Sequence, residues 1–254
     1  MQKGIHIYAL QGLPEYQVGD DIANTIIVSA QETLGGLETD DVLVVTQKIV
    51  SKSEGMTINL STIEPGVESR SLAERTGKDP RLVELILRES KSLVRVEEER
   101  GIIISETHHG FVCANAGIDS SNIPGEDNVC LLPRDSNKSA RRIREQLIKR
   151  TNLENIAVLI SDTFGRPWRD GHLNFAIGSS GIRPIHDYRD TIDAVGKVMR
   201  VSMTATADIL AAAADLVSGK ATNTPISLIR GLDYETGLED ARMLLRDVKK
   251  DLFR

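Results

Sequence analysis

Two aspartates in this chain each follow a short apolar run and have neighbours suited to binding a cation. Asp119 stands in the sequence Asn-Ala-Gly-Ile-Asp, shortly after an apolar stretch that ends at Ala114. Asp162 directly follows Leu159–Ser161 and precedes Thr163. Carboxylate and hydroxyl oxygens are the ligands that Mg²⁺ and Mn²⁺ prefer, so the pattern predicts a divalent metal site. A turn in which Asp119 accepts hydrogen bonds from backbone N–H groups is the structural alternative.

Two arginines and the only tryptophan follow Asp162 within a few residues. They occur in the sequence Gly-Arg-Pro-Trp-Arg as Arg166, Trp168 and Arg169. We expect these residues to lie in one loop, where cations and a flat ring suit a phosphorylated ligand that carries a ring system. A buried Asp–Arg ion pair is the structural alternative for this segment.

Two further segments have the composition of phosphate-binding edges. Lys48 and Lys52 follow the apolar run Val42–Val45, where ammonium groups beside hydroxyls can bind phosphate. Solvated surface lysines are an equally good interpretation of that pattern. In the segment 11–14, Gln-Gly-Leu-Pro, the glycine allows backbone N–H groups to turn toward an anion, although an ordinary turn between a strand and a helix also explains it.

Short apolar strands and amphipathic helices must position these groups. The predicted strands are Ile5–Leu10, Val42–Thr46, Leu93–Val96, Ile102–Ser105, Phe111–Ala114, Val129–Leu132, Ile156–Ser161 and Ile226–Arg230. Four helices are predicted most clearly. The first begins at Asp79-Pro80, the second extends from Ser139 to Arg150, the third covers Ala205–Ser218 with Gly219 as its C-cap, and the fourth covers Leu238–Leu252. About eight strands and six helices in irregular order predict an α+β (mixed α/β) fold. With no Pro-, Gly- or Ser-rich linker, residues 1–254 are expected to form one catalytic unit.

The composition argues against several classes of protein. A formal charge of −6, from 31 Lys and Arg against 37 Asp and Glu, makes nucleic acid and anionic membranes poor partners. No apolar run approaches the roughly 20 residues of a membrane span. Cys113 and Cys130 lie in apolar stretches without zinc-type spacing, so we expect reduced core thiols in a cytoplasmic protein.

Common nucleotide-binding and hydrolase motifs are absent from the sequence. It contains neither a P-loop nor a G-x-G-x-x-G fingerprint, and neither G-x-S-x-G nor H-E-x-x-H. A nucleotide site in this chain therefore requires a less common scaffold. The adjacent His108 and His109 are expected in a loop and not as ligands, and nothing in the spacing assigns His172 to a site.

Taken in order, the polar segments resemble the coenzyme F420:L-glutamate ligase family, the gamma-glutamyl ligases of deazaflavin biosynthesis. The shared motifs are Gln-Gly-Leu-Pro, Thr-Gln-Lys-Ile-Val-Ser-Lys-Ser-Glu-Gly, Asn-Ala-Gly-Ile-Asp-Ser-Ser-Asn, Ser-Asp-Thr-Phe-Gly-Arg-Pro-Trp-Arg, Asn-Phe-Ala-Ile-Gly and the helix with Ala207-Asp208. The likeness extends from about Ile5 to Arg230. It implies a GTP-dependent ligase that adds L-glutamate to the unglutamylated precursor of coenzyme F420, with a mixed α/β fold and typically as an intertwined homodimer.

The resemblance also implies cofactors and site residues. Two divalent ions, Mn²⁺ or Mg²⁺, would be held by Asp119, Asp162 and Thr163, with K⁺ as an activating ion. The nucleotide would be contacted by Gln11, Gly12, Leu13, Pro14, Gln47, Lys48, Lys52, Asn122, Ser218, Gly219, Lys220, Ala221, Thr222, Asn223, Thr224 and Pro225. Some members have an acidic metal ligand where this chain has Lys220, so we expect Lys220 to offer charge to the phosphates instead.

The implied reaction has two steps. The carboxylate of the acceptor attacks the γ-phosphate of GTP, giving an acyl phosphate and GDP, and the α-amine of glutamate then displaces phosphate. Metal ions on Asp119 and Asp162, with Lys52 and Arg166 nearby, would reduce the repulsion between these anions. Arg166 and Arg169 are also candidates to bind the phosphodiester of the acceptor.

Two other functions remain open at this stage. One is a metal-dependent phosphohydrolase or phosphoryl transferase that uses the same aspartates. The other is a nucleotide-binding regulatory protein without chemistry. The chain is too short to include the flavin-binding nitroreductase-like domain that is fused to some bacterial relatives.

Overall fold

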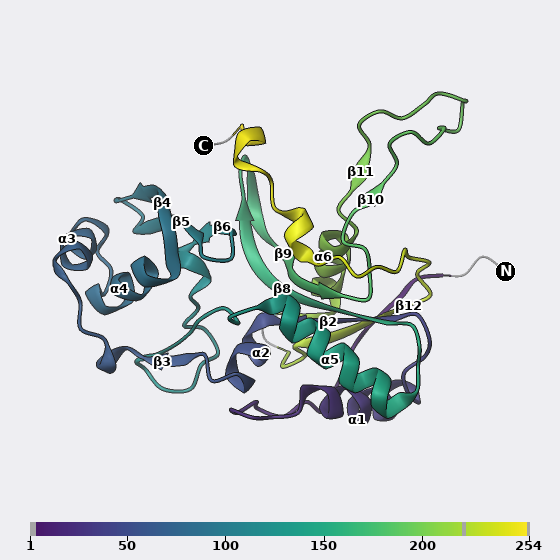
Figure 1. The fold of residues 1–254 in the computed structure, drawn as a ribbon. Helices are drawn as coiled ribbons and strands as arrows, with labels where there is room; N and C mark the ends of the chain where they lie inside the picture. The colour runs from purple at the N-terminus through teal and green to yellow at the C-terminus, as the bar shows by residue number, and fades with distance from the viewer. Residues whose placement is uncertain (1–3, 220–221, 253–254) are drawn as a thin grey trace.

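The computed structural model describes residues 4–219 and 222–252 and centres on a mixed five-stranded sheet (Figure 1). The strands, in spatial order, are β1 (His6–Ala9), β12 (Ile226–Arg230), β2 (Asp41–Thr46), β8 (Ile156–Arg166) and β9 (Arg169–Ser180). Strands β2 and β8 are parallel, and the other neighbouring pairs are antiparallel. The sheet therefore has one pair of strands whose carboxyl ends lie together.

Helices cover both faces of this sheet. Helices α1 (Ile22–Leu34) and α5 (Ser136–Thr151) pack on one face, and α6 (Thr206–Ser218) packs on the other. Alternate side chains of β2 serve the two faces: Leu43 belongs to the core under α1 and α5, and Val44 belongs to the core under α6. A strand buried on both faces has a nearly continuous apolar sequence, which explains the run at β2.

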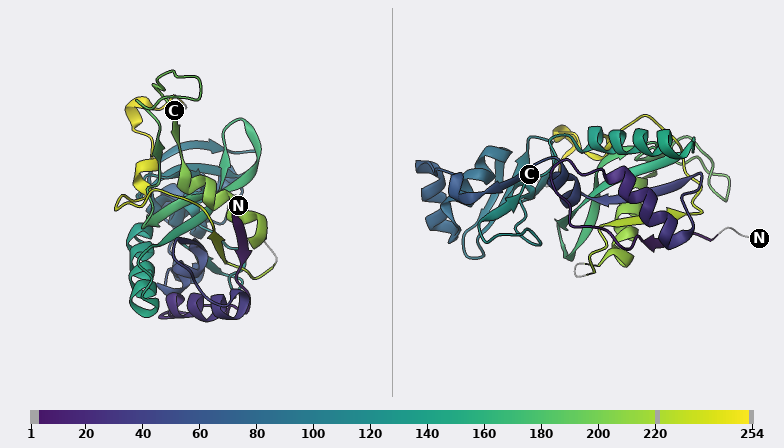
Figure 2. Two further views of the ribbon diagram at one scale, coloured as in Figure 1. Left: turned by 90° about the vertical axis from the view of Figure 1, so that its right-hand side faces the viewer. Right: turned by 90° about the horizontal axis from the view of Figure 1, so that it is seen from below.

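Residues 57–130 form a small lobe beside the sheet, which Figure 2 shows as a separate group of elements. Its elements are β3 (Thr57–Asn59), η1 (Leu60–Thr62), α3 (Val67–Thr76), α4 (Pro80–Glu89), β4 (Ser90–Glu97), β5 (Ile102–Thr107), β6 (Val112–Ala114), η2 (Asn115–Gly117) and β7 (Asn128–Cys130). Val83, Ile86 and Ile103 lie at the centre of its own core. The chain enters the lobe through β3 and leaves it through β7, and these two strands pair antiparallel.

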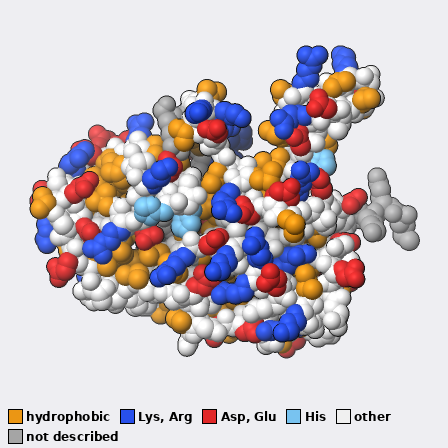
Figure 3. All heavy atoms as spheres, in the orientation of Figure 1, with side chains coloured by type: hydrophobic (Ala, Val, Ile, Leu, Met, Phe, Trp, Pro, Cys, Tyr) orange, Lys and Arg blue, Asp and Glu red, His pale blue; other side chains and the backbone are white. Residues whose placement is uncertain are grey.

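A long excursion between β9 and α6 projects from the body of the molecule (Figures 1 and 3). We call residues 186–204 the arm. Its base is the pair β10 (His186–Asp187) and β11 (Met203–Thr204). Apolar side chains more than half exposed on the arm are Ile192, Val195, Val198, Val201 and Met203.

The structure confirms most predicted elements and the α+β fold class. Helix α4 begins after Asp79, whose carboxylate accepts a hydrogen bond from the Arg81 backbone N–H at 2.8 Å. Helix α6 ends at Ser218, with Gly219 as its C-cap. Helix α5 starts earlier than predicted, because Asp135 and not Ser139 caps it, accepting from the Lys138 N–H at 2.9 Å.

The predicted helix over Leu238–Leu252 is wrong. The segment contains only two short 3₁₀ turns, η3 (Ala241–Leu244) and η4 (Val248–Lys250). The side chains of Asp240 and Asp247 hydrogen-bond to backbone N–H groups two residues on, which favours turns over a continuous helix. Ala241 is fully buried and Leu245 packs against the core under α1 and α5, whereas Leu252 is 84% exposed, so the apolar residues of this segment do not form one continuous buried helix face.

Strand β9 is the main element that the sequence analysis missed. Strand β8 continues past Ser161 to Arg166 and turns back into β9. Arg166 and Arg169 are therefore the paired ends of two strands and do not lie in one loop, contrary to the expectation from sequence. His108 and His109 lie in the turn between β5 and β6, which confirms their expected place in a loop. Cys113 and Cys130 are buried free thiols, as expected. Among the described residues, no helix combines the length and apolarity needed to cross a bilayer.

Candidate active site

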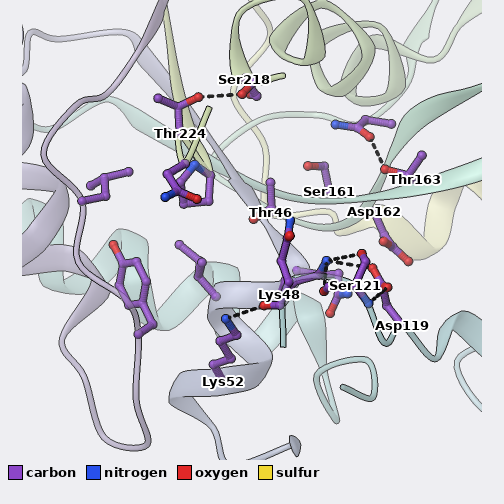
Figure 4. Close-up of a pocket in the computed structure, with 18 of the residues that line it drawn as sticks. Thr46, Lys48, Lys52, Asp119, Ser121, Ser161, Asp162, Thr163, Ser218 and Thr224 are labelled. Carbon is purple, nitrogen blue, oxygen red and sulfur yellow. Dashed lines mark hydrogen bonds and ion pairs between the residues drawn. The ribbon is translucent and has the colours of Figure 1, made fainter. Parts of the chain in front are cut away.

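A cavity of about 510 Å³ lies at the edge of the sheet where β2 and β8 come together (Figure 4). Thr46, the last residue of β2, is in register with Ser161 of β8. Both residues line the cavity. The parallel pairing therefore brings the polar segments that follow the two apolar runs to one place, as is common in sheets that contain parallel strands.

Lys48 occupies one side of this cavity. The chain leaves β2 and enters α2 (Gln47–Ser53) at once, so Lys48 lies in the first turn of a helix. Its Nζ lies 2.8 Å from Asp119 Oδ2 and donates to the backbone oxygen of Ser121 at 2.8 Å. Only 19% of the Lys48 side chain is exposed, so it is not a solvated surface lysine.

Lys52 lies one turn further along the same helix and also faces the cavity. Its ammonium group forms an ion pair with Glu15 and donates to the backbone oxygen of Asn122 at 3.0 Å. The side chain is 10% exposed. Lys48 and Lys52 thus form a cationic part of the cavity wall, and their ammonium groups are held by Glu15 and by the segment 119–122.

Asp162 also lines the cavity. It lies on β8, where the strand is paired with β9. Burial, and to a smaller extent the nearby charge of Asp119, raises the pKa of Asp162 to about 7 against the opposing effects of the Thr163 backbone N–H and Lys48. The carboxyl group thus lies in a place where negative charge is costly without a cation.

Asp119 approaches Asp162 from the small lobe (Figure 4). Burial alone would raise its pKa, but hydrogen bonds from Lys48 and from the Ser121 backbone outweigh that effect and hold the pKa below its usual value. The Ser121 N–H donates to Asp119 Oδ1 at 2.7 Å, so the backbone turn predicted as an alternative is present. Asp119 closes this turn and faces the cavity at the same time.

The turn before Asp119 has an unusual backbone. Asn115, Ala116 and Gly117 all have positive φ angles, of 53°, 54° and 72°. A Cβ atom on Gly117 would lie 2.8 Å from a methyl carbon of Leu132, so glycine is required there by space as well as by conformation. Ala116 is a non-glycine residue in the left-handed region, and such strain concentrates at functional sites.

The side chains of Asp119, Asp162 and Thr163 suit a divalent cation. They offer hard oxygen donors, and burial together with the neighbouring Asp119 makes the negative charge of Asp162 unfavourable without a cation. Among the described residues, no group of three His, Cys, Asp or Glu side chains could ligate a single ion. Mg²⁺ is commonly held in proteins through one or two carboxylates while substrate phosphates and waters complete the shell.

The hydroxyl group of Thr163 is fixed by residues that the sequence analysis did not assign to the site. It donates to Asn174 Oδ1 at 2.7 Å, and Asn174 Nδ2 donates to Asp215 Oδ1 at 3.2 Å. All three residues line the cavity. Their alignment depends on β9, which was not predicted, so sequence spacing alone gave no reason to connect them.

The segment 218–225 closes a further side of the cavity. Ser218, Gly219, Asn223, Thr224 and Pro225 line it. The Thr224 hydroxyl donates to the backbone oxygen of Ser218 at 2.6 Å, which shapes the loop after α6. Lys220 and Ala221 lie outside the described residues, so their predicted contacts stay predictions.

The remaining predicted residues divide into two groups. Those that line the cavity with Lys48 and Lys52 are Leu13, Pro14, Gln47 and Asn122. Gln11, Gly12, Thr222 and Arg166 are not in its wall as described, and Arg166 instead donates to the backbone oxygen of Asp170 at 3.2 Å within the β8–β9 hairpin. Their predicted roles stay predictions.

The structure also brings to the cavity residues that the sequence analysis had not assigned to the site. Among them are Glu15, Tyr16, Ser161, His172, Asn174 and Asp215. His172 lines both this cavity and a second one of about 150 Å³, which also contacts Asp119, Asp162 and Thr163. The spacing gave no reason to assign His172 to the site, and it lines the cavity because β9 folds it back beside β8.

The small cavity is largely neutral apart from the two aspartates. Cys113, Ile118 and Phe164 form part of its wall. Burial, and secondarily the charge of Asp162, raises the pKa of the Cys113 thiol to about 12, so this thiol stays protonated at neutral pH. The aspartates thus line both the large cavity and the small one.

Comparison with known proteins agrees with this architecture. Residues 12–231 match the family described as F420-0:Gamma-glutamyl ligase. Relatives named coenzyme F420:L-glutamate ligase are 44% identical in Methanothermobacter thermautotrophicus, over 99% of both chains, and 44% identical in Methanopyrus kandleri, over 93% of this chain and 92% of the relative. The relative of that name from Methanocaldococcus jannaschii is 37% identical over 95% and 94%. The chain therefore belongs to the F420-0:gamma-glutamyl ligase family.

Proposed function

We propose that this protein is a GTP-dependent ligase that joins L-glutamate to the unglutamylated precursor of coenzyme F420 through an acyl phosphate, releasing GDP and phosphate. The names of its relatives supply glutamate and coenzyme F420 as the substrate classes. The observation that carries the proposal is one cavity lined by two lysines and two aspartates, with Lys48 and Asp119 in direct contact. Its volume of about 510 Å³ lies within the range of pockets that hold small-molecule ligands.

The arrangement suits the transfer of a phosphoryl group between two anions. In the first step, the acceptor carboxylate attacks the γ-phosphorus of GTP and the bond to the β-phosphate oxygen breaks. The ammonium groups of Lys48 and Lys52 lower the repulsion between these anions. In the second step, the amine of glutamate attacks the acyl carbon and phosphate leaves. The walls formed by 13–14, α2 and 218–225 would hold the nucleotide.

Asp119, Asp162 and Thr163 would hold two Mn²⁺ or Mg²⁺ ions, and K⁺ would be an additional activating ion. When bound, the divalent ions would neutralise phosphate charge and orient the γ-phosphoryl group. Lys48 keeps Asp119 ionised and turned toward the cavity through their 2.8 Å contact. We place the enzyme in the cytoplasm, where its nucleotide substrate is abundant.

Mass spectrometry of the reaction products tests the proposal directly. The purified protein is incubated with GTP, Mn²⁺, L-glutamate and the unglutamylated deazaflavin coenzyme. We expect a mass gain of one or more glutamyl units that requires both GTP and metal. Phosphate release without glutamate would instead indicate a phosphohydrolase, and GTP binding without any product would indicate a regulatory nucleotide-binding protein.

We also propose that the active form is an intertwined homodimer, with the arm in the interface. Five apolar side chains of the arm are more than half exposed, and clustered exposure of this kind marks interaction surfaces. The family resemblance points to a second copy of the chain as the partner. Light scattering of the unmodified protein should therefore give twice the 27.9 kDa of one chain.

A charged substitution on the arm should dissociate this dimer. Val201 is 85% exposed in one chain, and Val201→Lys would place a charge in the proposed interface. Val67, which is 88% exposed on the small lobe, provides the matched control Val67→Lys. A monomeric native protein, or equal behaviour of the two variants, would contradict an interface at the arm.

A further inference from the structure

We infer that Asn174 and Asp215 are positioning residues that turn the hydroxyl proton of Thr163 away from the cavity, which leaves the Thr163 oxygen lone pairs free to bind a divalent cation. The inference rests on the proposed function, because it concerns the metal site suggested there. It assigns a role to two residues, Asn174 and Asp215, that are not among the proposed metal ligands Asp119, Asp162 and Thr163.

The three residues come from three elements that pack together. Thr163 on β8 is in register with Asn174 on β9, so their side chains meet on one face of the sheet. Asp215 lies on α6, which packs over β9. The Thr163 hydroxyl lies 2.7 Å from Asn174 Oδ1, and Asn174 Nδ2 lies 3.2 Å from Asp215 Oδ1. Asn174 is 6% exposed, so water does not compete freely for its amide group.

The chemistry of these groups fixes the direction of every hydrogen bond. An ionised carboxylate can only accept, so Asp215 requires the Nδ2 side of the Asn174 amide to face it. The Oδ1 side of the same amide then faces Thr163, and a carbonyl oxygen can also only accept. The Thr163 hydroxyl must therefore donate its single proton to Asn174. In this way Asp215 determines the orientation of a hydroxyl group with which it has no direct contact.

The orientation of that proton matters for cation binding. A hydroxyl group that points its proton into the cavity would present positive charge to a metal ion. Because the proton of Thr163 points to Asn174, the lone pairs of this cavity-lining hydroxyl, which follows Asp162 in the chain, stay available to a cation. Groups that orient metal ligands in this manner commonly affect metal affinity by about 10- to 100-fold.

Direct binding of the cation by Asp215 is the competing explanation, since Asp215 also lines the cavity. The two explanations predict different behaviour of a double variant. If Asp215 acts through the Thr163 hydroxyl, its charge loses its effect once that hydroxyl is removed. If Asp215 is a ligand itself, its removal weakens binding in either background.

The experiment measures Mn²⁺ binding to the full-length protein by electron paramagnetic resonance, without nucleotide. The variants are Asp215→Asn, Thr163→Val and the double variant. Asp208→Asn is the matched control, because Asp208 lies on the same helix and accepts from the backbone of β9, at Ala176 N–H and 3.0 Å, but is not part of the described cavity wall. Thermal melting of each variant verifies that it is folded.

We expect Asp215→Asn to weaken Mn²⁺ binding by about tenfold, because an amide at 215 no longer fixes the orientation of Asn174. The double variant should bind Mn²⁺ as Thr163→Val does, and Asp208→Asn should bind as the native protein does. Additive losses in the double variant would overturn the positioning role, and so would unchanged affinity in Asp215→Asn.

The result can be separated from the fate of the proposed function. Glutamyl transfer by the native protein is assayed on the same preparations. Product formation together with unaltered Mn²⁺ affinity in Asp215→Asn would reject the positioning role and leave the ligase intact. A native protein that binds no Mn²⁺ would reject the metal site together with the positioning role.

Discussion

Strands β2 and β8 end side by side, but the chain continues from them in different ways. After Thr46 the chain turns into α2, which presents Lys48 and Lys52 to the cavity. After Ser161 the strand continues and presents Asp162 and Thr163. One cavity thus receives its two lysines after one strand end and Asp162 after the other, while Asp119 reaches it from the small lobe.

The neighbouring strands account for this difference. On the far side of β2, pairing with β12 ends near Thr46, whose N–H donates to the backbone oxygen of Pro225 at 2.9 Å. On the far side of β8, pairing with β9 continues to the hairpin at Arg166. A strand that loses its partner can turn into a helix, whereas a strand that keeps its partner carries its polar residues onward in extended form.

Removal of the carboxylate on the β8 side should have the largest effect. We expect Asp162→Ala to lose glutamyl transfer by at least about a thousandfold, because the site loses an anion that faces the transferring phosphoryl group. The fold should persist, since Asp162 lies at the cavity surface and not in the apolar core.

Product formation by mass spectrometry and circular dichroism measure the two effects. Asp170→Ala, in the exposed hairpin of the same strand pair, is the control and should retain activity. Near-normal activity of Asp162→Ala would show that Asp162 on the β8 side does not act together with the lysines on the β2 side.

Removal of a cation on the β2 side should have a smaller effect. We expect Lys52→Gln to raise the KM for GTP by about 10- to 100-fold, since hydrogen bonds from charged donors contribute roughly 1.5–3 kcal/mol. The KM for glutamate should change little. Lys91→Gln in the small lobe, where Lys91 forms an ion pair with Glu106, is the control. Equal changes for both substrates would argue against a nucleotide side of the cavity.

The two aspartates should affect stability in opposite directions when metal is removed. The folded-state pKa of Asp162 is about 7, above the value of about 3.9 expected in the unfolded chain. The folded protein therefore binds the proton more tightly, and its free energy of unfolding falls as pH rises from about 4 to 7. In the presence of a chelator at pH 8, Asp162→Asn should be more stable than the native protein by roughly 1–3 kcal/mol.

Asp119→Asn should show the reverse. The folded-state pKa of Asp119 is lowered, so its stabilising effect is complete above its unfolded pKa and is lost as pH falls through the folded pKa. The variant should be less stable than the native protein at pH 8, and this difference should disappear on acidification. Urea denaturation at several pH values measures both variants. Differences of the same sign would contradict the contrast between the two carboxyl groups.

Most of the central sheet, and the position of Asp162 after an apolar strand, were predictable from sequence. The apolar run of β2 and the Asp79-Pro80 start of α4 depend on local composition and capping, which a sequence displays directly. The polar residues after Val45 and Ile160 marked the site by their composition, and the structure shows that parallel pairing of β2 and β8 brings them together.

The rest depended on pairing across long sequence distances. The start of β9, Arg-Asp-Gly-His-Leu-Asn, is too polar to indicate a strand and is extended because β8 supplies its partner. His172, Asn174 and Asp215 could therefore not be assigned to the site. The C-terminal segment 238–252 shows the opposite error, since helical spacing of apolar residues does not form a helix where Asp240 and Asp247 cap short 3₁₀ turns.

The small lobe joins the rest of the chain through two strands that lie next to each other, β3 and β7. A segment whose two ends are adjacent can be exchanged between related proteins with only two neighbouring crossover points. Because Asp119 and its turn lie within residues 57–130, such an exchange would carry one carboxylate of the cavity as part of the transplanted piece. Chimeras made with a relative 44% identical in sequence could thus vary one side of the active site while the lysines and Asp162 stay constant.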